Sequence, residues 1–368
     1  MAGKPYFFNF VESSSTKKIQ DLTIDPQILI DRMNIRKNAA ARASPTVLIL
    51  TKKSDIESDL VGIQLLKHGI DYVKITEEDI PLNFGFKFEI RKNEKSLLYL
   101  RNRKINPRNI KIVLFRYFDL KFLNYYTGIF QAFFAQQWYQ AFNCLRITLD
   151  STWINDSQKT FDAENRLKQL VTAQRIGLSI PETSITNSIL DGKKFFKRYS
   201  KSIMKVLHHH EIILNQRSFK FLTNNMELDH LLSFEDIVYA PVIFQEKIEN
   251  DSEIRVTVIG DKIFACKLSI KDKSKYSDLH KIRESKIIFE EINLGKKMEK
   301  QCIKLNRELG LHVSSIDLIQ SKNGELFFLE INPIGDWYWI EKHTNLPITK
   351  SMFDFVNGLL KKNRLHDS

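Results

Sequence analysis

Three oxygen-bearing side chains, Asp317, Glu330 and Asn332, are spaced so that they could bind one divalent cation. They belong to the stretch 314–332, in which apolar and polar residues alternate on both sides of Asn323-Gly324. An Asn-Gly pair between alternating runs is the strongest short signal for a β-hairpin with a two-residue type I′ turn. That turn places Asp317 opposite Glu330, and Asn332 shares their face because side chains two residues apart on a strand point the same way. The hairpin therefore predicts a carboxylate–carboxylate–amide set of the kind that suits Mg²⁺.

Two facing carboxylates repel each other across a β-ladder, so this arrangement needs a reason. A divalent cation between them removes the repulsion, which is the functional interpretation. A solvated hairpin face with two unrelated carboxylates fits the same spacing. The hairpin alone does not decide between the two, and residues elsewhere in the chain must do so.

A lysine inside an apolar strand is the second candidate. The stretch 192–210 has no acidic residue, and within it Ser202–Leu207 has the pattern of a strand with Lys205 in its middle. A buried ammonium group is costly unless it meets an anion, which points to a ligand such as phosphate. The run His208–His210 that follows is typical of a solvated loop, because three consecutive histidines cannot converge well on one metal ion.

Polar residues also mark two strands that follow. One strand ends in Gln245-Glu246-Lys247-Ile248, and the next, Glu253–Val258, carries Glu253 and Arg255 on one face. Upstream, Asp162–Gly177 predicts a helix with Asp162 as its N-cap and Arg166 in its first turn.

The first part of the chain predicts a β-α-β unit. Thr46–Thr51 reads as a buried strand, Asp55–His68 as a helix that stops at Gly69, and Asp71–Ile75 as the next strand. The unit has no GxGxxG fingerprint, so no phosphate site is expected there.

A helix over Ile129–Leu145 is crowded with aromatic residues on more than one face, which predicts core packing on two sides. A domain boundary is expected near Leu149–Ser151. A cluster of arginines in the first part of the chain favours a solvated basic face over a binding role, which stays open: Arg101, Arg103, Arg108 and Arg116.

Composition limits the possible classes of protein. The chain has 368 residues, of which 43% are hydrophobic, enough for one large core or two to three domains. The net charge of +12 favours acidic partners, namely phosphates, nucleic acid or acidic peptides. Three scattered cysteines without metal spacing fit a reducing cytoplasm, and the absence of a signal-peptide pattern and of a long apolar run predicts neither secretion nor a membrane span.

The order of these residues along the chain resembles the ATP-grasp ligase superfamily. In that family a strand lysine holds the α- and β-phosphates of ATP, a hinge strand pairs with adenine, and an acid binds ribose. An arginine holds the γ-phosphate or acyl phosphate, and a D…E-x-N set binds two Mg²⁺ ions. The residues that match in turn are Lys205; Gln245, Glu246, Lys247 and Ile248; Glu253; Arg255; and Asp317, Glu330 and Asn332. Arg166 stands where the family often has a second lysine, so the resemblance implies a phosphate role for it as well.

Over residues 150–360 the resemblance is to one particular group within this superfamily. Asp150–Thr183, Pro241–Gly260 and the tryptophan-rich Asn332–Ile348 are similar to the graspetide, or microviridin-type, peptide maturases, including the grasp-with-spasm group. One departure is visible, since no glycine-rich phosphate loop follows Lys205.

The implied fold is α/β (α+β): a pre-ATP-grasp α/β domain over 1–149, then an ATP-grasp fold over 150–363 in which two α+β subdomains grip ATP. The first part of the latter, 150–248, contains a central lid at about 183–245, and 249–363 is the C-terminal catalytic subdomain.

This resemblance implies a macrocyclase. ATP phosphorylates an Asp or Glu side chain of a ribosomal precursor peptide, and a Ser, Thr or Lys of the same peptide attacks the acyl phosphate. An ω-ester or ω-amide ring closes. The implied partner is a precursor with a leader and an acidic core, which a positively charged chain suits, with no nucleic acid and no membrane. A homodimer is a possible assembly, and the aromatic segment Trp337–Trp339 is expected to help exclude water.

Two alternatives stay open. Another ATP-grasp ligase, such as a glutamate ligase, would add free amino acids to a carboxylate, and product mass separates it from a macrocyclase. A non-catalytic basic module that binds nucleic acid is supported by the net charge and by the stretch 192–210. The ordered set of Mg²⁺-type oxygens argues against the second alternative, because nucleic-acid binding does not need it.

Overall fold

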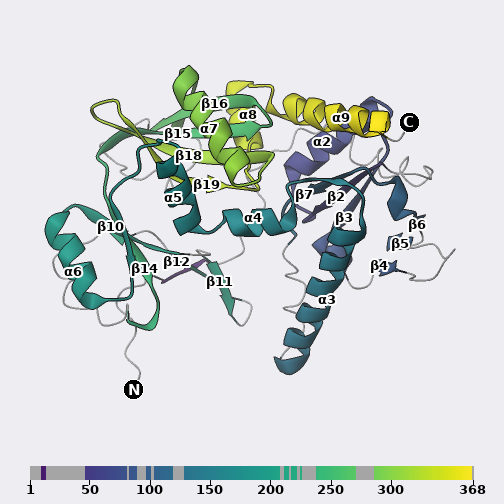
Figure 1. Ribbon diagram of the computed structural model, residues 1–368, viewed down its shortest axis with the longest axis horizontal. Coiled ribbons are helices and arrows are strands. Elements are labelled where there is room, and N and C mark those ends of the chain that lie inside the picture. The colour runs from purple at the N-terminus through teal and green to yellow at the C-terminus, as the bar shows by residue number, and fades with distance from the viewer. Residues whose placement is uncertain are drawn as a thin grey trace.

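The computed structural model describes residues 10–13, 46–80, 83–88, 97–100, 103–118, 128–207, 211–214, 217–221, 224–225, 238–270 and 286–366. Helices and strands follow one another along these ranges, which gives the mixed α/β fold that the sequence predicts. Figure 1 shows an N-terminal sheet beside α3, a central sheet beside α6, and a C-terminal sheet beside α7. None of the helices in these ranges has the length and hydropathy needed to span a membrane.

The N-terminal sheet is parallel. In spatial order its strands are β3 (Tyr72–Thr76), β2 (Val47–Thr51), β7 (Ile112–Phe115) and β8 (Thr152–Ile154). Every residue of β2 is buried, because an apolar strand with neighbours on both edges and cover on both faces has no solvent side. The predicted β-α-β unit is confirmed: α2 (Ile56–Lys67) links β2 to β3 and ends at His68, before Gly69 with φ +72°.

Strand β8 lies beyond the expected domain boundary near residue 149. It pairs in parallel with β7 through Thr152↔Ile112, Trp153↔Val113 and Ile154↔Leu114. A boundary at residue 149 would separate β8 from its own sheet. We therefore propose that the N-terminal domain ends after Ile154.

Helix α3 (Gly128–Thr148) covers the N-terminal sheet and a small antiparallel sheet. The small sheet contains β4 (Phe84–Lys87), β5 (Leu97–Leu100) and β6 (Arg103–Ile105). On its packed side the ring of Trp138 lies 6.4 Å from that of Phe84, between ring centroids. On the other side Phe133 is 53% exposed and Tyr139 is 54% exposed, so the prediction that both sides of this helix are packed is wrong for these residues.

The central sheet carries the predicted lysine strand. Its order is β13 (Asn224–Asn225), β10 (Ser202–Val206), β14 (Val242–Glu246) and β9 (Thr183–Thr186). Helix α6 (Ile189–Arg198) covers one face, where Phe196 packs with Met204 and Phe244. Lys205 and Gln245 lie on the opposite face because they alternate with Met204 and Phe244 along their strands. Beside it, β1 (Phe10–Ser13), β12 (Arg217–Phe221) and β11 (Glu211–Leu214) form a separate three-stranded sheet.

The C-terminal sheet is antiparallel and has the order β17 (Ile287–Glu291), β16 (Lys262–Ile270), β15 (Asn250–Ile259), β18 (Val313–Ser321) and β19 (Leu326–Asn332). Helices α5 (Arg166–Arg175) and α7 (Lys296–Glu308) pack on one face through a core that includes Leu170, Leu305 and Phe328. Beyond β19 the chain forms α8 (Tyr338–Thr344) and α9 (Ile348–His366), and α9 packs against α2 of the N-terminal domain. Figure 1 shows α2 and α9 side by side.

The hairpin of β18 and β19 has the predicted pairing but not the predicted turn. Gly324 N–H donates to the Ser321 carbonyl at 2.9 Å and Ser321 N–H to the Glu325 carbonyl at 2.8 Å, so the loop holds three residues rather than two. Only Gly324 in this loop has a positive φ, +84°, whereas a type I′ turn needs two such residues. A β-bulge between Asp317 and Leu318 then shifts the register back by one residue.

The predicted helix over 162–177 is two helices. Asp162 lies inside α4 (Ser157–Ala163), and α5 begins at Arg166 with Asn165 as its N-cap. The Asn165 side chain accepts a hydrogen bond from Lys168 N–H at 3.0 Å, so it takes the capping role expected for Asp162. The helix ends where predicted, at Gly177 with φ +86°.

Candidate active site

The two predicted carboxylates face each other. Asp317 on β18 pairs with Glu330 on β19 in the antiparallel register. The Asn332 side-chain amide lies between them, with Nδ2 at 3.2 Å from Asp317 Oδ2 and 3.1 Å from Glu330 Oε1. The structure therefore brings together all three residues that the sequence predicts as metal ligands.

Each carboxylate also contacts an arginine. Arg255 on β15 is the cross-strand neighbour of Asp317, and its Nη1 lies 2.6 Å from Asp317 Oδ1 and 2.7 Å from Oδ2. Arg166, the first residue of α5, places Nη1 at 2.7 Å from Glu330 Oε2. The two cations compensate the repulsion that two facing carboxylates would otherwise have.

Helix α5 is fixed against β19 by one side chain. Gln169, buried in α5, donates from Nε2 to the Ile331 carbonyl at 2.9 Å and accepts at Oε1 from Ile331 N–H at 3.1 Å. Ile331 is the residue after Glu330, so this pair of hydrogen bonds sets the position of Arg166 relative to Glu330. The Gln169 side chain could not be assigned this role from the sequence, because its partner lies 162 residues away.

Arg255 is largely buried and keeps its positive charge. Its Nε atom is buried and has no hydrogen-bond partner among the described residues. Burial by itself lowers the pKa of the Arg255 guanidinium, but the charge of Asp317, with smaller contributions from Glu330 and Asp336, outweighs this and raises it. Arg255 is therefore a permanent cation beside Asp317.

Lys205 lies within electrostatic reach of this group. Burial lowers the pKa of the Lys205 ammonium; the charges of Glu330, Asp317 and Glu253 oppose that effect, and the charge of Arg166 adds to it. Its Nζ donates to Gln245 Oε1 at 3.0 Å, and no ion pair of 4.0 Å or less joins it to a carboxylate in the described part of the chain. This is the environment expected of a lysine whose ionic partner is an anionic ligand.

Both polar atoms of the Gln245 side chain form hydrogen bonds within the central sheet. It is buried, its Nε2 donates to Thr183 Oγ1 at 3.0 Å, and its Oε1 accepts from Lys205. Its side chain thus positions Lys205. Glu246, Lys247 and Ile248 follow at the end of β14, where the strand leaves the sheet, and their predicted role in binding adenine stays a prediction.

The oxygen set fits a hard divalent cation. Asp317, Glu330 and Asn332 converge closely enough for one amide nitrogen to contact both carboxylates. Rotating the Asn332 amide by half a turn would present its oxygen at the same point, and carboxylate and amide oxygens are the ligands that Mg²⁺ prefers. These three residues could therefore hold Mg²⁺ beside the phosphates of a nucleotide.

Replacing Lys205 with methionine should weaken nucleotide binding by about 100-fold, because a desolvated, charge-assisted hydrogen bond to phosphate contributes about 2–3 kcal/mol. Stability without nucleotide should stay equal or rise, since the variant no longer buries an ammonium that lacks a carboxylate partner. Calorimetric titration with ADP and Mg²⁺ gives the affinity, and thermal unfolding gives the stability. Lys201→Met, which alters an exposed lysine next to the same strand, is the matched control. A large loss of stability with normal affinity would show that Lys205 is a structural residue.

A second cluster of charged groups was missed by the sequence analysis. Arg116, assigned there to a solvated basic face, is only 3% exposed. Its Nε donates to Asp55 Oδ2 at 2.9 Å, and its Nη2 lies 3.7 Å from Glu57 Oε2 and 3.3 Å from Asp336 Oδ1. The one local signal was position, because Arg116 directly follows the apolar strand β7 at the carboxyl edge of a parallel sheet.

This cluster joins the N-terminal domain to the segment after Asn332. Arg116 Nη1 donates to the Ile334 carbonyl at 2.9 Å, and Glu57 Oε1 accepts the N–H groups of Trp337 and Tyr338, each at 3.2 Å. Trp337 is fully buried and its Nε1 donates to Thr349 Oγ1 at 3.1 Å. Trp337 is therefore a core residue that packs the segment after Asn332 against the N-terminal sheet, and the expectation that the segment Trp337–Trp339 helps to exclude water stays a prediction.

Glu57 should make stability depend on pH. Burial raises the pKa of Glu57 from 4.5 to about 7, although the charge of Arg116 opposes the shift. The folded state then binds a proton that the unfolded state has already lost, so stability falls as pH rises from 4.5 to about 7.

The variant Glu57→Gln keeps the acceptor oxygen for Trp337 and Tyr338 but does not titrate. Relative to the parent, it should gain about 3 kcal/mol of unfolding free energy between about pH 4.5 and pH 8. Urea unfolding at both ends of that range measures the difference. Glu308→Gln, at a more exposed carboxylate, is the matched control. An equal pH slope in Glu57→Gln and the parent would contradict the assignment.

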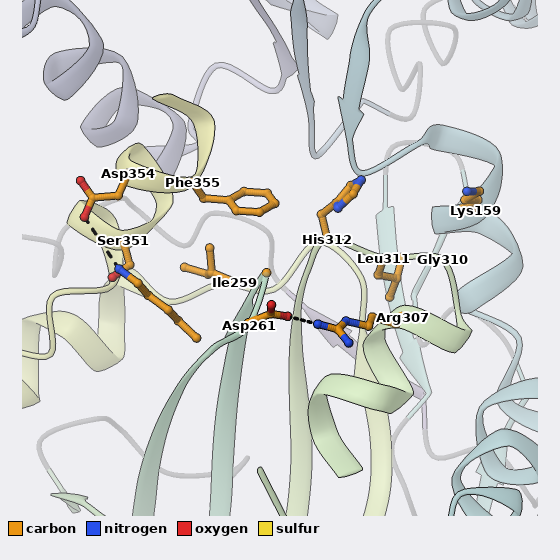
Figure 2. Close-up of a pocket in the computed structure, with 12 residues that line it drawn as sticks. Lys159, Ile259, Asp261, Arg307, Gly310, Leu311, His312, Ser351, Asp354 and Phe355 are labelled. Atoms are coloured by element: carbon orange, nitrogen blue, oxygen red, sulfur yellow. Dashed lines mark hydrogen bonds and ion pairs between the residues drawn. The ribbon is translucent and has the colours of Figure 1, made fainter. Parts of the chain in front are cut away.

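A cavity of about 640 Å³ lies elsewhere, between the β15–β16 turn, the end of α7 and α9 (Figure 2). None of the predicted site residues lines it. Arg307 there pairs with Asp261, and Lys262 lies 3.8 Å from Asp354. The charged side chains of this cavity are thus largely paired with one another at the surface. The carboxylate cluster of Asp317 and Glu330 is therefore the better candidate for the active site.

Comparison with known proteins agrees with the geometry. A family model described as the RimK-like ATP-grasp domain matches residues 163–356, more than half of the chain. The chain belongs to the RimK-like ATP-grasp family. It is therefore an ATP-grasp ligase of the ADP-forming kind, and its fold implies the use of ATP.

Two kinds of relative are found. A tetrahydromethanopterin:α-L-glutamate ligase from Methanocaldococcus jannaschii is 21% identical over 318 residues, which cover 83% of this chain and 97% of that protein. Among solved structures, macrocyclase MdnC from Microcystis aeruginosa, bound with precursor peptide MdnA, has a TM-score of 0.76 at 23% identity and covers 85% of this chain and 100% of that one. A RiPP-associated ATP-grasp ligase from Chryseobacterium gregarium, in complex with ADP and a leader and core peptide, has a TM-score of 0.75 at 22% identity, with 86% and 97% covered. At these identities the structural likeness shows the fold alone.

Proposed function

We propose that this ligase is a peptide macrocyclase, which activates Asp or Glu side chains of a ribosomal precursor peptide and closes ω-ester or ω-amide rings. The observation that carries the proposal is the likeness in fold to MdnC, which covers 85% of this chain and the whole of that one. MdnC was solved with its precursor peptide, and the Chryseobacterium gregarium ligase with a leader and a core peptide. A precursor with a leader and an acidic core is thus the proposed partner, and the net charge of +12 suits it.

The residues of the site support a phosphoryl transfer. Lys205 is proposed to bind the α- and β-phosphates of ATP together with Arg166, Glu253 is proposed for the ribose, and the segment 245–248 is proposed for adenine. Two Mg²⁺ ions, held by Asp317, Glu330 and Asn332, would supply positive charge around the γ-phosphate. Arg255, whose charge is held beside Asp317, is proposed to neutralise the acyl phosphate that forms on the peptide.

The nucleophile is proposed to come from the peptide. Burial raises the pKa of the Cys266 thiol to about 11 and that of the Cys302 thiol to about 12, so both are protonated and inert near neutral pH. A Ser, Thr or Lys side chain of the precursor would attack the acyl phosphate instead. The cysteines also fit a cytoplasmic location, which is part of this proposal.

Product mass tests the proposal. The enzyme is incubated with ATP, Mg²⁺ and the acidic peptides encoded near its gene, and each product is weighed. Each ring should remove the mass of one water and consume one ATP. ATP hydrolysis without any change in every candidate peptide would contradict the macrocyclase activity.

A second candidate function is favoured by one observation. The relative from Methanocaldococcus jannaschii, matched over nearly its whole length, is named a glutamate ligase. An enzyme of that kind would join a free amino acid to the activated carboxylate. The acceptor would then gain the mass of one amino-acid residue, so the same measurement separates the two functions.

A further inference from the structure

The turn after the metal-type residues brings one more carboxylate to the site. Asp336 lies four residues beyond Asn332, and Gly335 before it has φ +51° and lies directly against β18. A Cβ atom at Gly335 would lie 2.7 Å from Ser315 Oγ and 2.9 Å from Ser315 N, so only glycine allows this close approach. Ser315 pairs with Asn332 and is two residues before Asp317, which places the turn beside the carboxylate cluster.

One oxygen of Asp336 is held on both sides. Tyr117 Oη donates to Oδ1 at 2.5 Å, and Arg116 Nη2 lies 3.3 Å from the same oxygen. Arg116 is itself fixed by buried Asp55 and by the carbonyl groups of Ile334 and Gly335. The carboxylate of Asp336 is thus oriented by a buried network that belongs to the other domain.

The second oxygen of Asp336 is free to act. The side chain is 46% exposed, and in the part of the chain that the structure describes no hydrogen bond reaches Oδ2. The charge of Asp336 is among those that raise the pKa of Arg255, so the carboxylate acts on the guanidinium that contacts Asp317. Burial, and next the charge of Asp336, raises the pKa of the Tyr117 hydroxyl, which therefore stays a donor.

We propose that Asp336 is the catalytic base of the second half-reaction. The inference rests on the proposed function, because it assigns the proton acceptor for attack on the acyl phosphate. A lone pair of the attacking oxygen or nitrogen forms a bond to the acyl carbon. The bond from that carbon to the phosphate oxygen breaks, and phosphate leaves with the electron pair. The proton of the nucleophile passes to Asp336 Oδ2 and from there to water.

Tyr117 and Arg116 are positioning residues in this scheme. Holding Oδ1 leaves Oδ2 as the basic atom and fixes its direction, as second partners do for catalytic carboxylates and histidines. A hydroxyl nucleophile needs this help most, because it is far too weakly acidic to lose its proton before it attacks.

The test compares the two half-reactions in Asp336→Asn. Asparagine can still accept hydrogen bonds from Tyr117 and Arg116, but it cannot take a proton. The acyl phosphate is trapped with hydroxylamine, which attacks without a base, and the hydroxamate is counted. Ring closure is followed by mass in a single turnover across a range of pH. Asp261→Asn, at a surface aspartate paired with Arg307, is the matched control.

Asp336→Asn should form the hydroxamate within a few-fold of the parent rate but close rings at least about 100-fold more slowly. Tyr117→Phe keeps the base and removes only one of the donors that orient it, so it should slow ring closure less than Asp336→Asn does. Ring closure at the parent rate would overturn the proposal, and so would an equal loss of hydroxamate and rings. If the parent product gains an amino-acid residue, the macrocyclase proposal fails. The same comparison then tests Asp336 as the base for that amine.

Discussion

Replacing Glu330 with glutamine is expected to lower turnover by about 10²–10³-fold, the loss seen when one electrostatic contact to a transition state is removed. Glu330 pairs with Asp317 across the ladder and contacts Arg166 Nη1 at 2.7 Å. Glutamine has nearly the same volume, so packing is kept while one negative charge of the proposed Mg²⁺ set is lost. The measurement is ADP release with saturating ATP and peptide.

The control for Glu330→Gln lies on the same hairpin. Glu325 is exposed at the turn and accepts a hydrogen bond from Ser179 Oγ at 2.8 Å, away from the carboxylate cluster. Glu325→Gln should keep the parent activity. Full activity of Glu330→Gln at ordinary Mg²⁺ concentration would contradict the metal assignment, and partial rescue by raised Mg²⁺ would support it.

The sequence was sufficient for the residues whose chemistry is local to a strand. Alternation between the two faces of a strand depends on backbone geometry alone, and burial along β10 follows it, with Ser202 and Met204 buried and Lys205 half-buried. Along β18 the first four residues are all buried, so burial does not alternate there. The predicted pairing of Asp317 with Glu330 is confirmed. It was reached from a two-residue turn, whereas the chain uses a three-residue loop and a compensating bulge. A turn shifted by one residue without the bulge would have put Glu330 on the opposite face.

Contacts between residues far apart in the sequence could not be predicted from local patterns. Arg116 reads as one of several surface arginines, because its partners Asp55 and Asp336 are 61 and 220 residues away. The segment Trp337–Trp339 was interpreted from its aromatic residues as a cover for the site, and the sequence did not indicate that Trp337 lies in the core. In both cases the side chain's role is decided by which domain packs against it, and no local pattern encodes that choice.

Replacing Arg116 with methionine should lower the free energy of unfolding by about 3–5 kcal/mol, as expected when one member of a buried ion cluster is removed. Asp55, which is fully buried, and Glu57 would lose their main positive partner. The pKa of Asp55, which burial raises but Arg116 and Thr51 bring down to about 2, should then rise. Methionine fills much of the same space, so the loss would report charge rather than a cavity.

Urea unfolding measures the Arg116→Met loss, as a lower midpoint with an unchanged slope. Arg307→Met is the matched control, because its ion pair with Asp261 is exposed and should contribute about 0–1 kcal/mol. The double variant Arg116→Met, Asp55→Asn should recover part of the loss, since a neutral amide can be buried at lower cost than an unpaired carboxylate. A loss below about 1 kcal/mol in Arg116→Met would show that the cluster does not hold the two domains together.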